Sequence, residues 1–141
     1  MPLYIVKKDI TRMNVDAIAT TAKSLPEVGE GIDPIIYKVA SYNLLLRQRK
    51  LLGVIPEGKA MTTLAFRIPA LGIIHTVFPK WEGGSYGEEN ILRQCYRSIL
   101  SEAVNNEFES VAIPFSNNDN FGFPKEIAIT AALEEIRSFI N

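Results

Sequence analysis

The apolar run at residues 72–78, GIIHTVF, limits the fold of this chain more than any other feature. An unbroken apolar strand is typical of a sheet that is covered on both faces, as parallel sheets are. Further stretches with the character of strands lie at residues 3–7, 15–20, 59–64 and 110–115. Because segments with helical spacing of apolar residues alternate with strands, the sequence predicts an α/β domain with a largely parallel sheet.

Three helices are expected. Asp33 stands immediately before Pro34, a good N-cap followed by a good first helical residue, and the apolar pattern that follows predicts a helix ending near Gly53. Ser85 and Glu88 have the spacing of a capping box, which predicts a helix in the segment after residue 88. A last helix is predicted over residues 124–140, since proline is favoured at the first helical position.

Length, charge and rare residues exclude several classes of protein. With 141 residues, of which 47% are hydrophobic, the chain fits a single domain over residues 1–141. Fifteen basic against 16 acidic residues give no support to a broad nucleic-acid surface. One Cys and one His exclude an internal disulfide and a zinc cluster. His75 lies in the apolar strand and Cys95 on an apolar helix face, so both are expected in the core. We expect no metal and no cofactor.

Targeting signals are also missing from the sequence. No apolar run approaches the length that spans a bilayer, and the start MPLYIVKKD lacks the apolar region of a signal peptide. The sequence therefore predicts a cytoplasmic protein with no membrane partner. Its oligomeric state is left open.

Residues 111–124, VAIPFSNNDNFGFP, form the segment that says most about function. A short apolar strand runs into a polar loop, and Pro124 then opens a helix. In an open α/β sheet, ligands bind beyond the carboxyl ends of the strands, and the N-terminus of a helix attracts anions. The segment alone is equally compatible with an ordinary strand-to-helix turn.

Six blocks of the chain, in order, resemble the macrodomain family, whose members bind ADP-ribose and in some cases remove it from proteins or metabolites. The blocks are MPLYIVKKDIT, VDAIATTAKS for the family's VDAIVNAANS, GEGID for GGGVD, IIHTVFPKW for IHTVGPxW, ENILRQCYRSIL for the middle helix, and IPFSNNDNFGFP for PxxSTGIYGYP. The resemblance implies a three-layer α/β/α sandwich with a mixed, largely parallel central sheet. The family's last strand and helix have no counterpart in the sequence.

The same resemblance implies a ligand site. Asp9 would accept a hydrogen bond from the adenine amino group with Ile10 beside the ring, and two loops, residues 28–32 and 117–121, would cradle the diphosphate. Phe121 replaces the family's Tyr near the ribose. The implied ligand-binding residues are Asp9, Ile10, Thr20, Lys23, Gly29, Glu30, Gly31, Ile32, Asn117, Asn118, Asp119, Asn120 and Phe121.

Departures from the family pattern gather at this site. Thr20 and Lys23 replace the Asn pair, and an ammonium group can only donate hydrogen bonds. Lys23 could reach a phosphate, or pair with Glu27 or Glu30 and block the site. Glu30 and Asp119 each replace a glycine and add negative charge beside the expected diphosphate, which opposes binding.

Asp33 is the one candidate catalytic residue. It stands where some hydrolytic members have their catalytic Asp, but Tyr37 replaces the His one turn later, and an N-cap role also explains Asp33.

The leading hypothesis for function is therefore a degenerate macrodomain. It would bind ADP-ribose or a related nucleotide, either free or on an ADP-ribosylated protein, without hydrolase activity. An active hydrolase of ADP-ribosyl groups or ADP-ribose phosphoesters is the first alternative. A nucleotide-independent protein-interaction domain is the second.

Overall fold

The structure, a computed structural model, describes residues 2–115 and 121–140. In chain order the elements are a 3₁₀ helix η1 (Ile10–Arg12), β1 (Ala17–Thr21), α1 (Asp33–Ala40), α2 (Tyr42–Leu52), β2 (Ala60–Thr63), β3 (Gly72–Thr76), α3 (Glu88–Asn105), β4 (Val111–Ala112) and α4 (Lys125–Ile140). Strands and helices alternate as the sequence predicts, with β2 and β3 consecutive.

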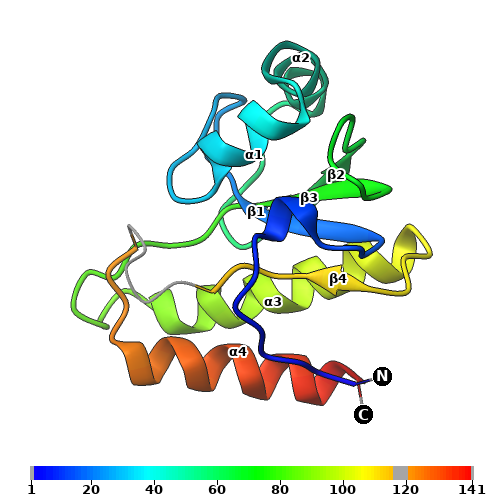
Figure 1. Cartoon of the computed structure of the whole chain (residues 1–141). Helices are drawn as coiled ribbons and strands as arrows, with labels where there is room; N and C mark the ends of the chain where they lie inside the picture. The colour runs from blue at the N-terminus through cyan, green and yellow to red at the C-terminus, as the bar shows by residue number, and fades with distance from the viewer. Residues whose placement is uncertain (1, 116–120, 141) are drawn as a thin grey trace.

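The four strands form one sheet in the order β2-β3-β1-β4. Strand β1 pairs in parallel with both β3 and β4, and only β2 runs antiparallel to its neighbour. Helices α1 and α2 lie on one face of this sheet and α3 and α4 on the other (Figure 1). The predicted three-layer α/β/α sandwich with a mixed, largely parallel sheet is confirmed.

The central strands explain why the sheet needs both helical layers. All five residues of β3 are buried, and successive side chains point to opposite faces because a strand has a period of two. Ile18 and Ile73 pack in the core under α1 and α2, whereas Ala19 and Ile74 pack in the core against α3 and α4. His75 and Cys95 are fully buried, as predicted.

The strand predicted at residues 3–7 is wrong. None of these residues belongs to a strand, and the side chains of Tyr4 and Ile5 are 76% and 83% exposed. A strand forms only where a neighbouring strand offers ladder hydrogen bonds. In the described sheet the edge strand β4 has two residues, and both pair with β1. The β-propensity of residues 3–7 therefore finds no partner there.

Two expectations about helix ends also need correction. The helix predicted from Asp33 to near Gly53 is broken at Ser41, whose φ of 142° ends α1 before α2 begins. Ser85 does not cap α3: Gly87 precedes the helix, with a φ of 73°. The carboxylate of Glu88 instead accepts backbone N–H groups of the preceding loop. Backbone N–H donors, its own first, hold the pKa of Glu88 at about 2.

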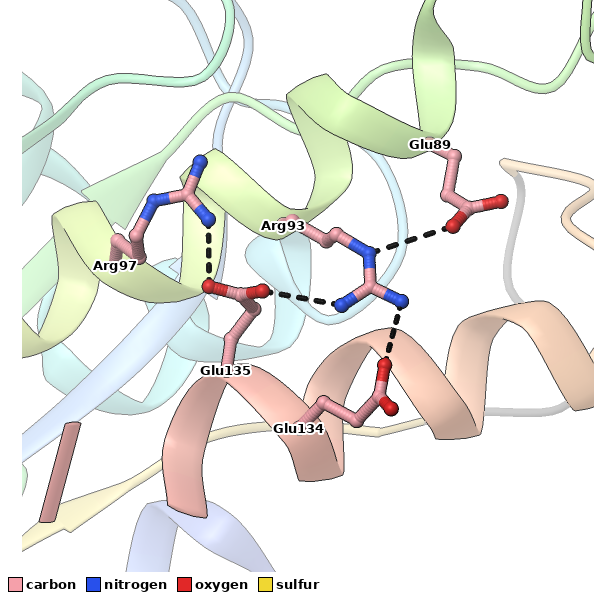
Figure 2. A network of polar contacts seen from close by, with 5 residues as sticks. All are labelled: Glu89, Arg93, Arg97, Glu134 and Glu135. Carbon is pink, nitrogen blue, oxygen red and sulfur yellow. Dashed lines mark hydrogen bonds and ion pairs between the residues drawn. The ribbon is translucent and has the colours of Figure 1, made fainter. Parts of the chain in front are cut away.

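An ion-pair network joins α3 to α4 (Figure 2). The guanidinium of Arg93, 20% exposed, lies 2.8 Å from Glu134, 3.1 Å from Glu135 and 3.3 Å from Glu89. Arg97 pairs with the other oxygen of Glu135. Because a planar guanidinium can donate to several carboxylates at once, Arg93 fixes how α4 lies on α3.

Replacing Arg93 by glutamine should therefore lower the free energy of unfolding by about 1 kcal/mol, since each partly exposed pair contributes a few tenths. Urea denaturation at low and at high salt measures this, and high salt should reduce the difference. Arg12→Gln is the control, because Arg12 is 87% exposed and its ion pair with Asp9 is long, at 3.8 Å. Equal losses in the two variants would contradict a clamping role for Arg93.

Candidate functional site

The loop between β1 and α1, residues 22–32, lies at the carboxyl end of a central strand, where open α/β sheets bind ligands. Gly29 lets this loop approach the strand closely. A Cβ at this position would stand 2.6 Å from the carbonyl oxygen of Thr21 and 2.9 Å from the amide nitrogen of Lys23. Both are backbone atoms that a side chain cannot push aside, so the loop requires glycine here.

The carboxylate of Asp33 holds this loop in place through a hydrogen bond. Its side chain is fully buried; one oxygen accepts the hydroxyl of Thr20 at 2.6 Å, and the other accepts the N–H of Gly29 at 2.7 Å. The expected N-cap role is wrong, because Ile32 is the N-cap and Asp33 is already helical. Burial raises the pKa of Asp33 to about 6, although both hydrogen bonds and the charge of Arg49 oppose the shift.

Thr20 is also fully buried, with its hydroxyl committed to Asp33. The structure therefore places Thr20 behind the loop, as a support for Asp33.

Past Gly29, the loop presents three successive backbone N–H groups. Within the described residues, no acceptor contacts the N–H of Glu30, Gly31 or Ile32. Glu30 and Gly31 are exposed, and Ile32 caps the start of α1. Unpaired N–H groups and the positive end of a helix dipole together make an anion-binding arrangement.

The predicted adenine pair lies next to this loop. Ile10 is buried in the cluster against which Val28 and Ile32 pack. The side chain of Asp9 is 56% exposed and borders an open hollow of about 440 Å³ lined by residues 8, 9 and 12–14. Its Oδ1 accepts both the hydroxyl and the N–H of Thr11, which lowers the pKa of Asp9. Among the residues that the structure describes, Oδ2 has only a 3.8 Å contact with Arg12, so Asp9 can still accept a hydrogen bond from a ligand.

Two weak ion pairs occupy the outer side of the loop. Lys23 pairs with Glu27 at 3.2 Å, one of the two partners foreseen, and Glu30 pairs with Lys80 at 3.9 Å instead of with Lys23. All four side chains are more than half exposed, and such pairs contribute about 0–1 kcal/mol. Neither pair prevents a ligand from engaging Lys23 or Lys80.

The second predicted loop is described only from Phe121 onward. Asn117, Asn118, Asp119 and Asn120 lie outside the described residues, and their roles stay predictions. The carbonyl of Phe121 accepts the N–H of Trp81 at 2.7 Å, and its ring lies 5.8 Å from that of Phe78. The end of this loop therefore packs beside the segment that follows β3.

The other candidate reactive groups of the chain face the core. Burial lowers the pKa of His75 to about 3, and the His75 ring lies 2.9 Å from the hydroxyl of Thr63. Burial raises the pKa of the Cys95 thiol to about 12. Among the described residues, no group of three or more His, Cys, Asp or Glu side chains could hold a metal ion, and no helix is long and apolar enough to cross a membrane.

Sequence reasoning missed Arg49 and Lys80. Arg49 stands in the basic stretch RQRK, which gives no sign that one of its members is buried. Lys80 lies in the block IIHTVFPKW, but nothing in that block indicates its contact with Glu30.

The sequence model of the Macro domain family matches residues 18–132. The chain belongs to the Macro domain family. The O-acetyl-ADP-ribose deacetylase of Citrobacter rodentium is 35% identical over 142 residues, which cover 99% of this chain and 80% of that protein.

Solved macrodomains share the fold. The Oceanobacillus iheyensis macrodomain with ADP superposes with a TM-score of 0.86 at 28% identity, over 94% of this chain and 73% of that one. A variant of the same macrodomain with ADPR gives 0.85 at 28% identity, over 94% and 75%.

The buried carboxylate of Asp33 predicts a pH dependence of stability. Its pKa is higher in the folded protein, about 6, than the ordinary value of 3.8, so folding takes up a proton between these values. The contribution of Asp33 to stability should therefore fall by about 2–3 kcal/mol as the pH rises from about 4 to about 7.

Urea denaturation of the parent and of Asp33→Asn across this range isolates the effect, because the amide does not titrate. The free energy of unfolding of the parent should fall relative to that of the variant with rising pH. A constant difference would show that Asp33 has an ordinary pKa.

Proposed function

We propose that the loop between β1 and α1, with Asp9 and Ile10 beside it, binds ADP-ribose or a related adenine nucleotide. The observation that carries this proposal is the row of three N–H groups, those of Glu30, Gly31 and Ile32, that have no acceptor within the described residues and lie at the start of α1. A diphosphate is the anion that such a row suits, because each phosphate oxygen can accept a charge-assisted hydrogen bond. Relatives that share the fold are known with ADP and with ADPR, which supports the same ligand class.

The parts of the ligand can be assigned to residues of this chain. The adenine lies on Ile10 with its amino group donating to Asp9, and the diphosphate lies across Gly29 to Ile32. The distal ribose reaches toward Lys23 and Phe121. Asn117, Asn118, Asp119 and Asn120 lie outside the described residues, and their part in the site stays a prediction. Lys23 leaves Glu27 for a phosphate at small cost, since that ion pair is half exposed.

The same residues argue that the site binds without hydrolysis. Asp33 has no exposed surface and holds Thr20 and Gly29 with its two oxygens, so burial keeps a catalytic water away from this carboxylate. Tyr37 stands one turn later and is also fully buried. Burial raises the pKa of this phenol well above its ordinary value, so the hydroxyl stays protonated and cannot act as a general base. We therefore propose a degenerate macrodomain that binds without turnover.

Hydrolysis of the acetyl ester of ADP-ribose is the second candidate function. The O-acetyl-ADP-ribose deacetylase of Citrobacter rodentium, 35% identical over almost the whole of this chain, favours this second function. It would require a water molecule to reach the buried carboxylate of Asp33.

Titration calorimetry with ADP-ribose, and with AMP as the control ligand, tests the binding proposal. ADP-ribose should bind at least about tenfold more tightly than AMP, because one charge-assisted hydrogen bond contributes about 1.5–3 kcal/mol. Equal affinities, or no heat with either ligand, would overturn the proposal.

Glu30→Gln gives this titration a matched comparison. Removing a carboxylate from the diphosphate loop should tighten ADP-ribose binding by about three- to tenfold, and less at high salt. Glu109→Gln makes the same charge change just before β4, at the opposite end of the sheet, and should leave the affinity unchanged. Equal effects would mean that the nucleotide does not lie beside Glu30.

Incubation with O-acetyl-ADP-ribose separates the two candidate functions. The parent should release no more acetate than Asp33→Asn, because Asp33 has no route to water. Release by the parent that is lost in Asp33→Asn would establish the hydrolase and overturn the proposal of a site without turnover.

A further inference from the structure

Arg49 of α2 is a buried cation that the ligand-binding residues above do not include. Its side chain has no exposed surface, although an arginine is seldom fully buried unless it is paired. No carboxylate lies within ion-pair distance among the described residues. The guanidinium donates instead to backbone carbonyls, so it stabilises the conformation of the main chain.

Three of these carbonyls belong to the first loop of the site. One nitrogen of Arg49, Nη2, lies 2.9 Å from the carbonyl oxygen of Lys23 and 3.2 Å from those of Ser24 and Leu25. The other, Nη1, donates to the carbonyl of Gly53 at the end of α2. Four carbonyls are thus turned inward toward one guanidinium. Carbonyl oxygens that faced the cleft would repel the phosphate oxygens of a nucleotide.

Arg49 and Asp33 hold the two ends of the same loop. Arg49 binds the carbonyls of residues 23–25, where the loop leaves β1, and Asp33 binds the N–H of Gly29, just before the N–H groups of Glu30, Gly31 and Ile32. The charge of each side chain suits the backbone group that it binds: the guanidinium of Arg49 donates to carbonyl oxygens, and the carboxylate of Asp33 accepts an N–H. The two buried charges also attract each other, which lowers the pKa of Asp33 against the larger effect of burial.

We infer that Arg49 is a positioning residue for the diphosphate and distal-ribose part of the site, which it shapes by holding residues 23–25. The inference rests on the proposed function for its ligand. Adenine recognition does not depend on Arg49, because Asp9 and Ile10 lie on a separate segment that receives no hydrogen bond from it. Arg49 should therefore govern the preference for ADP-ribose over AMP.

Two variants of Arg49 test this. In Arg49→Met the four carbonyls lose the guanidinium, although those of Ser24 and Leu25 still accept the N–H groups of Ile55 and Glu27. In Arg49→Lys a single ammonium nitrogen keeps the charge but cannot span the carbonyls of residues 23–25 and Gly53. Arg49→Met should bind ADP-ribose at least about tenfold more weakly than the parent, with AMP affinity within about threefold, and Arg49→Lys should lie between them.

Leu45→Ala is the matched control. Leu45 is fully buried on the same helix, in the cluster against which Val28 and Ile32 pack, but it donates no hydrogen bond to the loop carbonyls, so its loss destabilises the fold without freeing them. The control should leave the ratio of the two affinities unchanged. If Arg49→Lys keeps the parent's ratio, or if Leu45→Ala lowers the ratio as much, the inference is overturned.

Hydrogen exchange measured without any ligand tests the role of Arg49 independently of the proposed function. The hydrogen-bonded amides of Ala22, Glu27 and Gly29 should exchange at least about tenfold faster in Arg49→Lys than in the parent, and at the parent's rate relative to the rest of the chain in Leu45→Ala. A parent that binds neither nucleotide would refute the proposed function while this exchange still reports on Arg49. Unchanged exchange in Arg49→Lys would show that Arg49 does not hold the loop.

Discussion

The hydrogen bonds from Thr20 and Gly29 to the buried carboxylate of Asp33 are the contacts on which the site depends. A charged carboxylate without solvent is costly, and the pKa of Asp33 rises to about 6 as a result. The two donors offset part of this cost, and they join α1 to β1 and to the loop between them. Because Gly29 lies against the strand backbone, no other residue can bring its N–H to Asp33 in the same way.

The geometry of the loop follows from these two bonds together with the buried Arg49. Asp33 uses the N–H of Gly29 and leaves those of Glu30, Gly31 and Ile32 without an acceptor in the described part of the chain. Asp33, the candidate catalytic residue, thus has a structural use. The proposal that the site binds a nucleotide without turnover rests on this use.

Much of the fold was accessible from the sequence, because the buried run at residues 72–78 and the alternation of elements leave few alternatives. The strand at residues 3–7 was predicted wrongly. These residues favour extended backbone, but whether a neighbouring strand pairs with them depends on the tertiary structure. At the site, the resemblance indicated the loop between β1 and α1 and pointed to Asp33. The structure added that Asp33 accepts hydrogen bonds from Thr20 and Gly29. In the sequence, the basic stretch around Arg49 looks like a solvated helix face. The burial of its guanidinium depends on three loop carbonyls that precede it by 24 to 26 positions in the chain. The roles of residues 117–120 stay predictions.

The central claim is that the N–H groups of Glu30, Gly31 and Ile32 receive an anionic nucleotide. An NMR titration of the ¹⁵N-labelled protein with ADP-ribose tests it most directly. The account predicts that these three amide signals shift downfield and saturate together, since each N–H donates to a phosphate oxygen, while the N–H of Gly29 stays close to its starting position on Asp33. Saturable shifts elsewhere, with Glu30, Gly31 and Ile32 unmoved, would contradict the account.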